Sequence, residues 1–289
     1  MDIRAIIMGL TFALIWSSAF TSARIIVTNA SPLAALSLRF FISGLIGISI
    51  ARFLGQKWHL TPNQWRATII FGVCQNAIYL GLNFYAMQTV EASLASIIAS
   101  SMPLLVAFAG WVFLKDSLPV MSILGLIFGM VGVVIIMSSR INSGIDFYGV
   151  TFCIIAAIAL TVATLSIKSM SSGENLLMVV GLQMLVGAVP LTIASALTET
   201  LHINVTAGLI TAFIYTTLAP GLLATWIWFK LVARIGATRA ATFHFLNPLI
   251  GVTIAAIVLG ESLSQYDIIG VIVIMVGILA VQLSHQVDR

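Results

Sequence analysis

Two stretches of this 289-residue chain carry one pattern: residues 102–118 read MPLLVAFAGWVFLKDSL, and residues 247–263 read NPLIGVTIAAIVLGESL. The offset that aligns them also aligns residues 92–136 with residues 237–281 without a gap. The clearest coincidences are Pro103-Leu104 with Pro248-Leu249, Asp116-Ser117-Leu118 with Glu261-Ser262-Leu263, Gly125 with Gly270, and Met130-Val131-Gly132 with Met275-Val276-Gly277. Apolar runs seldom share proline, glycine and an acid by chance, so the chain is predicted to contain an internal repeat.

The residues before these stretches extend the repeat more weakly. The matching segments are Gly9-x-Thr11-Phe12 with Gly149-x-Thr151-Phe152 and, after a small insertion, Arg39-Phe40 with Gln183-Met184. We therefore divide the chain into a first repeat at residues 1–140 and a second at residues 141–289.

The composition indicates a membrane protein. Hydrophobic residues make up 60% of the chain and charged residues 8%, whereas a soluble domain is about 25% charged. A bilayer-crossing helix needs roughly 20 apolar residues, so the connections are short and a sizeable soluble domain is excluded. The ten transmembrane helices predicted from breaks at charges, prolines and Gly/Ser/Asn clusters cover residues 5–27, 33–54, 66–86, 92–114, 119–138, 147–167, 175–198, 205–229, 237–259 and 264–284.

The basic residues indicate topology rather than a nucleic-acid surface. The net charge of +4 is spread thinly between apolar runs, and short cytoplasmic loops of membrane proteins collect Lys and Arg. With a cytoplasmic N-terminus, the outer ends keep Arg24 and Arg140, and Arg39 lies some way into the second helix. The inner loops then collect Arg4, Arg52, Lys57, Arg66, Lys115, Lys168, Lys230, Arg234, Arg239 and Arg289. Both termini are predicted to be cytoplasmic.

An odd number of helices per repeat turns the second copy upside down in the bilayer relative to the first. Inverted repeats recur in transporters, because a pseudo-two-fold axis in the membrane plane gives two similar states open to opposite sides. The predicted fold class is therefore an all-α integral membrane protein with ten transmembrane helices in two inverted five-helix repeats. A duplication that only enlarges the bundle is the alternative.

The paired Pro-Leu, acid-Ser-Leu and Met-Val-Gly motifs, with Arg39-Phe40 early in the second helix, resemble the EamA-type branch of the drug/metabolite transporter superfamily. Within that branch the chain is similar to the YddG-like exporters of aromatic amino acids. The resemblance spans essentially the whole chain, strongly at residues 92–136 and 237–281. It implies a ten-helix fold in a bacterial inner membrane, a central cavity lined chiefly by the first, third, fourth, sixth, eighth and ninth helices, and export of small amphiphilic metabolites.

The third predicted helix carries three candidate substrate contacts. Asn76, Tyr79 and Asn83 are spaced to share one face of a helix. An amide in hydrocarbon is costly without a partner, and transporters place such groups where water or substrate satisfies them. The alternative for Asn76 and Asn83 is a hydrogen bond to a neighbouring helix.

The fourth helix carries small polar residues and a proline with a counterpart in the second repeat. Ser96 and Ser100 are candidates to meet a polar substrate group, although small residues at this spacing also favour close helix packing. Pro103 and Pro248 each free a backbone carbonyl. They are predicted to act as hinges or ligand contacts, or simply as kinks that shape the bundle.

The ninth helix contains the only histidine inside a predicted span. An ionisable residue within the membrane is a functional candidate, so His244 and the neighbouring Asn247 are assigned to the cavity; helix packing is the alternative for His244. Trp16 and Trp226 are the aromatic side chains that we expect to contact substrate, because most other aromatic residues in such helices face lipid or the interface.

The placement of charges disfavours proton coupling through a carboxylate. Every Asp and Glu lies at a predicted loop or helix end, which leaves facilitated transport and proton coupling through His244 as the two alternatives. Arg39 is able to attract a carboxylate, but a structural ion pair or an interface anchor is the favoured interpretation.

The predicted function is a secondary transporter that exports small amphiphilic metabolites, most of all amino acids including aromatic ones, by alternating access. No P-loop, Gly-x-Ser-x-Gly or His-Glu-x-x-His pattern occurs, so no cofactor, metal or enzyme activity is expected. A carrier for nucleosides, sugars or organic cations is the alternative, and an intramembrane enzyme is a remote one. The expected partners are an amino-acid substrate and the lipid bilayer, not nucleic acid, and the protein is expected to be a monomer or weak homodimer.

Overall fold

The computed structural model describes residues 3–114, 119–141, 146–166, 175–235, 240 and 242–287, and nearly all of them are helical. In hydrocarbon a helix satisfies its own backbone N–H and C=O groups, which explains why apolar segments fold this way. Within the described residues, seven helices are long and apolar enough to cross a bilayer. Shorter apolar helices cover Val120–Ile136, Phe243–Leu259 and Gln265–Val281. The architecture is that of a helical, multi-pass membrane protein.

The first half of the chain contains α1 (Ile3–Val27), α2 (Pro32–Phe53), α3 (Pro62–Phe71), η1 (Gly72–Leu80), α4 (Gly81–Ala86), α5 (Ala92–Ser100), α6 (Met102–Leu114) and α7 (Val120–Ile141). The second half contains α8 (Phe147–Ser166), α9 (Leu176–Thr198), α10 (Ala207–Thr216), η3 (Thr217–Ala224), α11 (Thr225–Ile235), η4 (Thr242–Leu246), α13 (Asn247–Leu259) and α14 (Gln265–Val287). The predicted Asp116-Ser117-Leu118 motif and the basic residues Lys115, Lys168, Arg239 and Arg289 lie outside the described residues.

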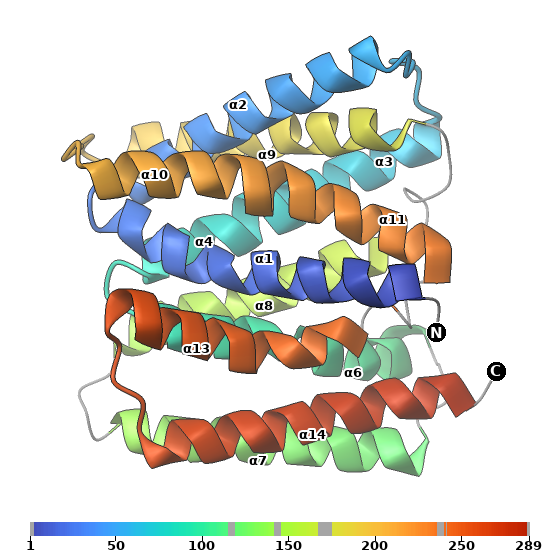
Figure 1. The fold of residues 1–289 in the computed structure, drawn as a ribbon, viewed down its shortest axis with the longest axis vertical. Coiled ribbons are helices and arrows are strands. Elements are labelled where there is room, and N and C mark those ends of the chain that lie inside the picture. Colours follow the sequence, from blue (N-terminus) through green and yellow to red (C-terminus); the bar gives the residue numbers. More distant parts are fainter. Residues whose placement is uncertain are drawn as a thin grey trace.

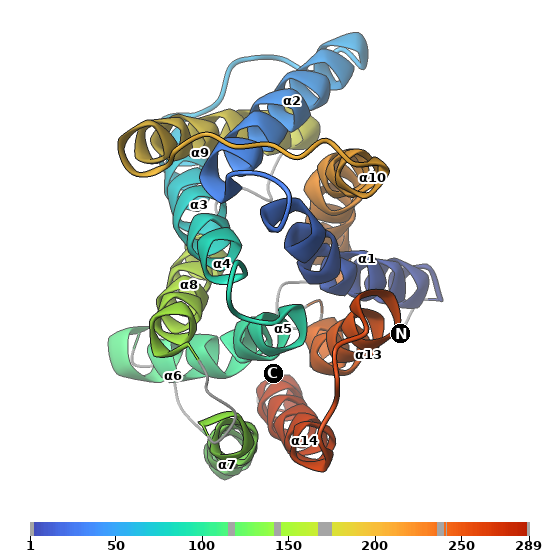
Figure 2. The ribbon, with the colours of Figure 1, turned by 90° about the vertical axis from the view of Figure 1, so that its left-hand side faces the viewer.

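Two helix pairs from distant parts of the sequence frame the bundle. Helix α2 packs along α9, and α7 packs along α14, at opposite edges of the nearly end-on view in Figure 2. A Cβ atom added to Gly125 would lie 2.6 Å from the carbonyl oxygen of Gly277, and one added to Gly132 would lie 2.8 Å from that of Gly270. The α7 and α14 backbones therefore touch, and the order of these contacts makes the two helices antiparallel.

Two long membrane helices contain π-helical segments in their middle. Segment η1 follows α3 without a break, and η3 follows α10 in the same way. The offset that aligns residues 92 and 237 places the first residue of η1, Gly72, on the first residue of η3, Thr217. Because π-helical turns are rare and occur frequently at functional sites, the interior of the bundle next to them is the first place to search for a substrate site.

Two glutamates at helix ends cap the first turns of other helices. The Glu199 carboxylate, after α9, accepts the backbone N–H groups of Leu33 and Ala34 at 2.8 and 3.0 Å. The Glu261 carboxylate, after α13, accepts those of Ala92 and Ser93 at 2.8 and 2.9 Å. The first turn of a helix has N–H groups without helical partners and a partial positive charge, so these carboxylates join α9 to α2 and α13 to α5.

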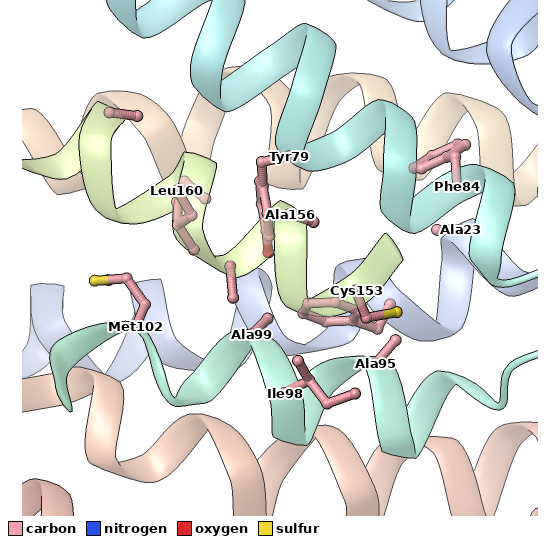
Figure 3. Close-up of a cluster of buried hydrophobic side chains, with 14 of the residues drawn as sticks. Ala23, Tyr79, Phe84, Ala95, Ile98, Ala99, Met102, Cys153, Ala156 and Leu160 are labelled. Carbon is pink, nitrogen blue, oxygen red and sulfur yellow. The ribbon is translucent and has the colours of Figure 1, made fainter. Parts of the chain in front are cut away.

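The apolar core extends over most of the helices, and one part of it lies where η1, α5 and α8 meet. Tyr79 of η1 points toward Ala156 and Leu160 of α8 and toward Ala99 of α5 (Figure 3). Alanine at these positions allows the helices to approach closely. This packing fixes the direction in which η1 presents its neighbouring polar residues.

Candidate functional site

Two adjoining cavities lie inside the bundle beside the π-helical segments. We call them the Gln75 cavity, of about 50 Å³, and the Asn83 cavity, of about 30 Å³, and together the central chamber. The residues that line both are Trp16, Arg39, Leu80 and Pro220. A cavity needs roughly 10–15 Å³ of such space to hold one water molecule, so the chamber has room for a few water molecules but not for an amino acid.

Segment η1 and the start of α4 supply the amides that the sequence singled out. Asn76 lines the Gln75 cavity, and Asn83 and Tyr79 line the Asn83 cavity. Asn76 Nδ2 donates to the backbone oxygen of Gln183 at 2.9 Å and to its side-chain Oε1. Asn76 thus lines the chamber and also bonds a neighbouring helix, which unites the two alternatives left open by the sequence.

Asn83 is more available to a ligand than Asn76. Its Nδ2 donates to the backbone oxygen of Tyr79 at 2.8 Å, and the side chain is 1% exposed. Its Oδ1 accepts no hydrogen bond from any described residue. A buried amide oxygen without a donor is costly, so Asn83 offers the chamber one unused acceptor.

Arg39 of α2 reaches the junction of the two cavities. The side chain is 3% exposed, and its guanidinium carbon lies 4.4 Å from the ring centroid of Phe40 and 5.7 Å from that of Phe84. Its Nη1 donates a long hydrogen bond of 3.5 Å to the carbonyl oxygen of Thr216. Thr216 is the last residue of α10, directly before η3, so Arg39 contacts the backbone where the helix changes from α-helical to π-helical hydrogen bonding.

The ion pair or interface anchor favoured for Arg39 from the sequence does not describe its position. Among the described residues, no acidic side chain forms an ion pair with Arg39, and its Nε has no hydrogen-bond partner. The side chain points into the bundle instead of toward an interface, because Thr216 and two aromatic faces hold it there. Arg39 is therefore a chamber residue.

Segment η4 places His244 in an aromatic cluster at the wall of the Gln75 cavity. The His244 ring centroid lies 4.9 Å from Trp228, 5.3 Å from Phe12 and 6.5 Å from Trp16. His244 Nδ1 lies 2.8 Å from Asn247 Nδ2. An amide nitrogen donates, so Nδ1 is the acceptor and the proton of the neutral ring is assigned to Nε2. Asn247 orients His244 and does not line either cavity within the described residues.

The two candidate tryptophans have different positions. Trp16, near the middle of α1, lines both cavities. Trp226 packs against Leu177, Met178 and their neighbours, with Lys230 Nζ 4.1 Å from its ring centroid. Within α11, Trp228 lines the chamber. Its ring stacks on that of Phe12, with the ring centroids 4.7 Å apart. We therefore place Trp228, in place of Trp226, in the cavity wall.

The serines of α5 lie behind the chamber. Ser100 Oγ donates to the backbone oxygen of Ser96 at 2.6 Å, and Ser96 faces Gly251 of α13 so closely that a Cβ there would collide with its hydroxyl. In the part of the chain that is described, neither serine lines either cavity. Of the two alternatives for these residues, helix packing agrees with this geometry.

Pro103 and Pro248 each lie at a junction between two helical segments. Pro103 is the second residue of α6, directly after the break from α5, and Pro248 is the second residue of α13, directly after η4. Proline fits the first turn of a helix because the N–H it lacks has no helical partner there. Met102 and His244, beside these two junctions, both line the Gln75 cavity.

Sequence reasoning overlooked Gln75, Gln183, Met184 and Trp228 as chamber residues. The repeat contained a signal for two of them, because Arg39-Phe40 aligns with Gln183-Met184 and all four residues line the Gln75 cavity. No acidic side chain of the described chain lines either cavity, and no cluster of described His, Cys, Asp or Glu residues is placed to hold a metal.

The fold and the chamber define a class: multi-pass helical membrane proteins with a polar and aromatic chamber inside the bundle. The sequence profile of the EamA-like transporter family matches residues 3–138 and again residues 147–283. The chain belongs to this family, which confirms the resemblance to EamA-type transporters. It is accordingly a membrane protein of a transporter family and not an enzyme.

Several relatives extend over nearly the whole chain. The uncharacterized transporter YvbV of Bacillus subtilis is 26% identical over 277 residues, which cover 96% of this chain and 90% of that protein. An uncharacterized transporter of Archaeoglobus fulgidus is 26% identical over 280 residues, which cover 94% and 96%. A solved crystal structure superposes with a TM-score of 0.70 at 18% identity and covers 100% of both chains, which shows a shared fold.

Proposed function

We propose that the protein is a secondary carrier that exports small amphiphilic metabolites, chiefly amino acids including aromatic ones, by alternating access. The central chamber is the observation that carries the proposal. Aromatic faces from Phe12, Trp16 and Trp228 surround the uncharged polar groups of Gln75 and Asn76. Such a wall suits a molecule with an apolar body and a polar end.

The proposed substrate contacts follow from the chamber walls. Trp16, Asn76, Tyr79, Asn83 and His244 contact substrate directly, joined by Trp228 and Arg39. Ser96, Ser100, Asn247 and Trp226 support these walls from outside the cavities. Pro103 and Pro248 act as hinges, because each lies where one helical segment ends and the next begins.

Alternating access is supported by signs of an inverted repeat of two five-helix units, residues 1–140 and 141–289. The family profile matches once in each unit. Gly125 contacts Gly277 while Gly132 contacts Gly270, and the repeat alignment equates Gly125 with Gly270 and Gly132 with Gly277. Reciprocal contacts of this kind are what a two-fold axis produces. Two related units then have two similar arrangements, open to opposite sides.

The proposed location is a bacterial inner membrane, with both termini in the cytoplasm. Helix α1 begins and α14 ends at the same end of the bundle (Figure 1). That end carries most of the described basic residues: Arg4, Arg52, Lys57, Arg66, Lys230 and Arg234. An excess of Lys and Arg in short loops marks the cytoplasmic side.

Exchange in liposomes tests the function. Purified protein in liposomes preloaded with unlabelled phenylalanine should take up labelled phenylalanine or tryptophan saturably, and equally with and without a pH gradient. Facilitated exchange is expected because the described chamber wall contains no carboxylate to carry a proton. His244→Gln should lower the exchange rate at least about tenfold, since the ring contacts three aromatic walls.

His59→Gln is the matched control, because His59 is an exposed loop residue. Exchange that depends on the gradient in wild type and loses that dependence in His244→Gln would replace facilitated transport with proton coupling through His244. Exchange of a nucleoside, a sugar or an organic cation, without amino-acid exchange, would contradict the proposed substrate. The absence of any exchange would contradict the carrier itself.

A further inference from the structure

We propose that Arg39 and Asn83 form a recognition site for the charged head group of an α-amino acid, with Arg39 binding the carboxylate and Asn83 Oδ1 accepting from the ammonium group. This inference rests on the proposed function and specifies its substrate chemistry. The two side chains line the same cavity. Within the described residues, each has a buried polar atom without a hydrogen-bond partner, Arg39 Nε and Asn83 Oδ1.

The burial of Arg39 is the first observation that points to an anion. A guanidinium presents five N–H donors and remains charged, yet the described residues offer it only one long hydrogen bond, to Thr216, and two aromatic faces. A buried charge without a counter-ion is strongly destabilising. A substrate carboxylate supplies the missing charge and fits the planar fork with two parallel hydrogen bonds.

The second observation is the orientation of Asn83. Its amide nitrogen is held by the Tyr79 carbonyl, whereas Oδ1, an acceptor only, meets no donor among the described residues. An ammonium group is a donor only. One donor-rich cation and one free acceptor in a single cavity therefore complement a zwitterion, whereas a cationic substrate would face the Arg39 charge.

The walls of the same cavity suit an apolar side chain. Trp16, Phe20 and Phe84 line it together with Met87. The cavity of about 30 Å³ is smaller than an amino acid, so the site is complete only when the chamber opens and closes around substrate. Pro220 of η3 lines both cavities beside Arg39.

Ligand-dependent thermal shifts of the purified protein test the site with three probes. L-phenylalanine has both charges, L-phenylalaninamide lacks the carboxylate and 3-phenylpropionate lacks the ammonium group. Wild-type protein should bind the amide at least about tenfold more weakly than phenylalanine, and the propionate several-fold more weakly, as expected for charge-assisted hydrogen bonds. Arg39→Met should remove the preference for phenylalanine over the amide, and Asn83→Leu should remove the preference over the propionate.

The ratio of the affinities for phenylalanine and its amide distinguishes a role of Arg39 in ligand recognition from a role in folding. Arg39→Met replaces an uncompensated buried charge by an apolar side chain of similar size, so the unliganded protein should be as stable as wild type or more stable. If Arg39 serves only to hold α2 against η3, the variant melts earlier and keeps its preference for the carboxylate. Arg39→Lys keeps the charge but loses the planar fork, and should retain an intermediate preference if the methionine variant does not fold.

Arg52→Gln and Gln88→Ala are the matched controls. Arg52 is an exposed arginine of the same helix, and Gln88 is an exposed amide that donates to the carbonyl three residues earlier; both should keep wild-type ratios. Equal wild-type affinity for phenylalanine and its amide, or no binding of any probe, overturns the head-group site. Failure of the proposed function looks different, because wild-type protein would then show no amino-acid exchange although the carboxylate probe still binds through Arg39.

Discussion

The α7–α14 interface and the central chamber are both built from apolar helices, but they differ in how completely their atoms are packed and hydrogen-bonded. At the interface, glycines bring two backbones into direct contact, and no space is left even for a methyl group at Gly125 or Gly277. In the chamber, Arg39 and Asn83 keep polar atoms without partners among the described residues. One region is packed to its limit, and the other is left incomplete.

This difference indicates which region stabilises the fold and which region lowers the stability of the unliganded protein. Between membrane helices, association depends on close packing of small residues, because lipid is as apolar as the side chains. Unpartnered polar groups in the interior lower stability, and they persist where a ligand completes them. Substitutions should therefore affect folding at the interface and substrate handling in the chamber.

The largest expected effect is on folding, from Gly277→Ala. The new methyl group would lie 2.6 Å from the carbonyl oxygen of Gly125 and 2.7 Å from the backbone nitrogen of Gly129. Backbone atoms inside a helix pair cannot rotate away as a side chain does, so the helices must separate. We expect a loss of about 2–3 kcal/mol in the free energy of unfolding, measured by denaturant titration in detergent.

Gly208→Ala is the control for that loss. A Cβ atom there would find its nearest neighbour, Thr206 Oγ1, at an ordinary 3.7 Å, so stability should remain near wild type. If both alanine variants unfold alike, close approach of α7 and α14 is not what holds this edge of the bundle.

The next effect should appear in transport and not in folding. Trp228→Ala removes a ring that stacks on Phe12 and lines the Gln75 cavity, and should lower the exchange of aromatic amino acids at least about tenfold. Trp226→Ala removes a ring from the same helix that packs outside the chamber, and should leave exchange close to wild type. A larger loss in Trp226→Ala would reverse the placement of these two tryptophans.

A smaller effect is expected from the Asn76–Gln183 pair, which combines helix packing with chamber lining. The two side chains line the chamber and also join η1 to α9. Hydrogen bonds between membrane helices contribute about 0.6 kcal/mol on average in double-mutant cycles. We expect a coupling of that size between Asn76→Leu and Gln183→Leu in thermal unfolding. A coupling near zero would mean that the two amides serve the chamber alone.

The fold was more predictable from the sequence than the chamber, for a physical reason. Apolar length and the paired proline, glycine and acid motifs of residues 92–136 and 237–281 are properties of the chain itself. They led to the helical membrane architecture and to the family. Which side chains share a cavity depends instead on the rotation of each helix about its axis.

The π-helical segments explain where face assignments failed. Segment η3 ends directly before α11, and a π-helical segment shifts the phase of the residues that follow it relative to a regular α-helix. The chamber therefore receives Trp228. Arg39 shows a different limit, because only the folded chain brings the Thr216 carbonyl to α2.

The smallest expected effect is electrostatic and lies outside both regions, at the start of α8. The Asp146 carboxylate accepts a hydrogen bond from Thr89 Oγ1 and others from backbone N–H groups of the first turn, and these bonds hold its pKa below the usual value. A lowered pKa in the folded state stabilises the protein above the unfolded-state pKa of about 3.9, and this stability is lost as the pH falls through the folded-state value. Asp146→Asn should therefore lower the melting temperature slightly at pH 7 and leave it unchanged at a pH low enough to protonate the wild-type carboxylate.

Thr89→Val, which removes the largest cause of the pKa shift, should behave similarly but more weakly. The stability loss of Gly277→Ala is the control and should be the same at both pH values. An Asp146→Asn effect that does not change with pH would assign the contact to packing instead of charge.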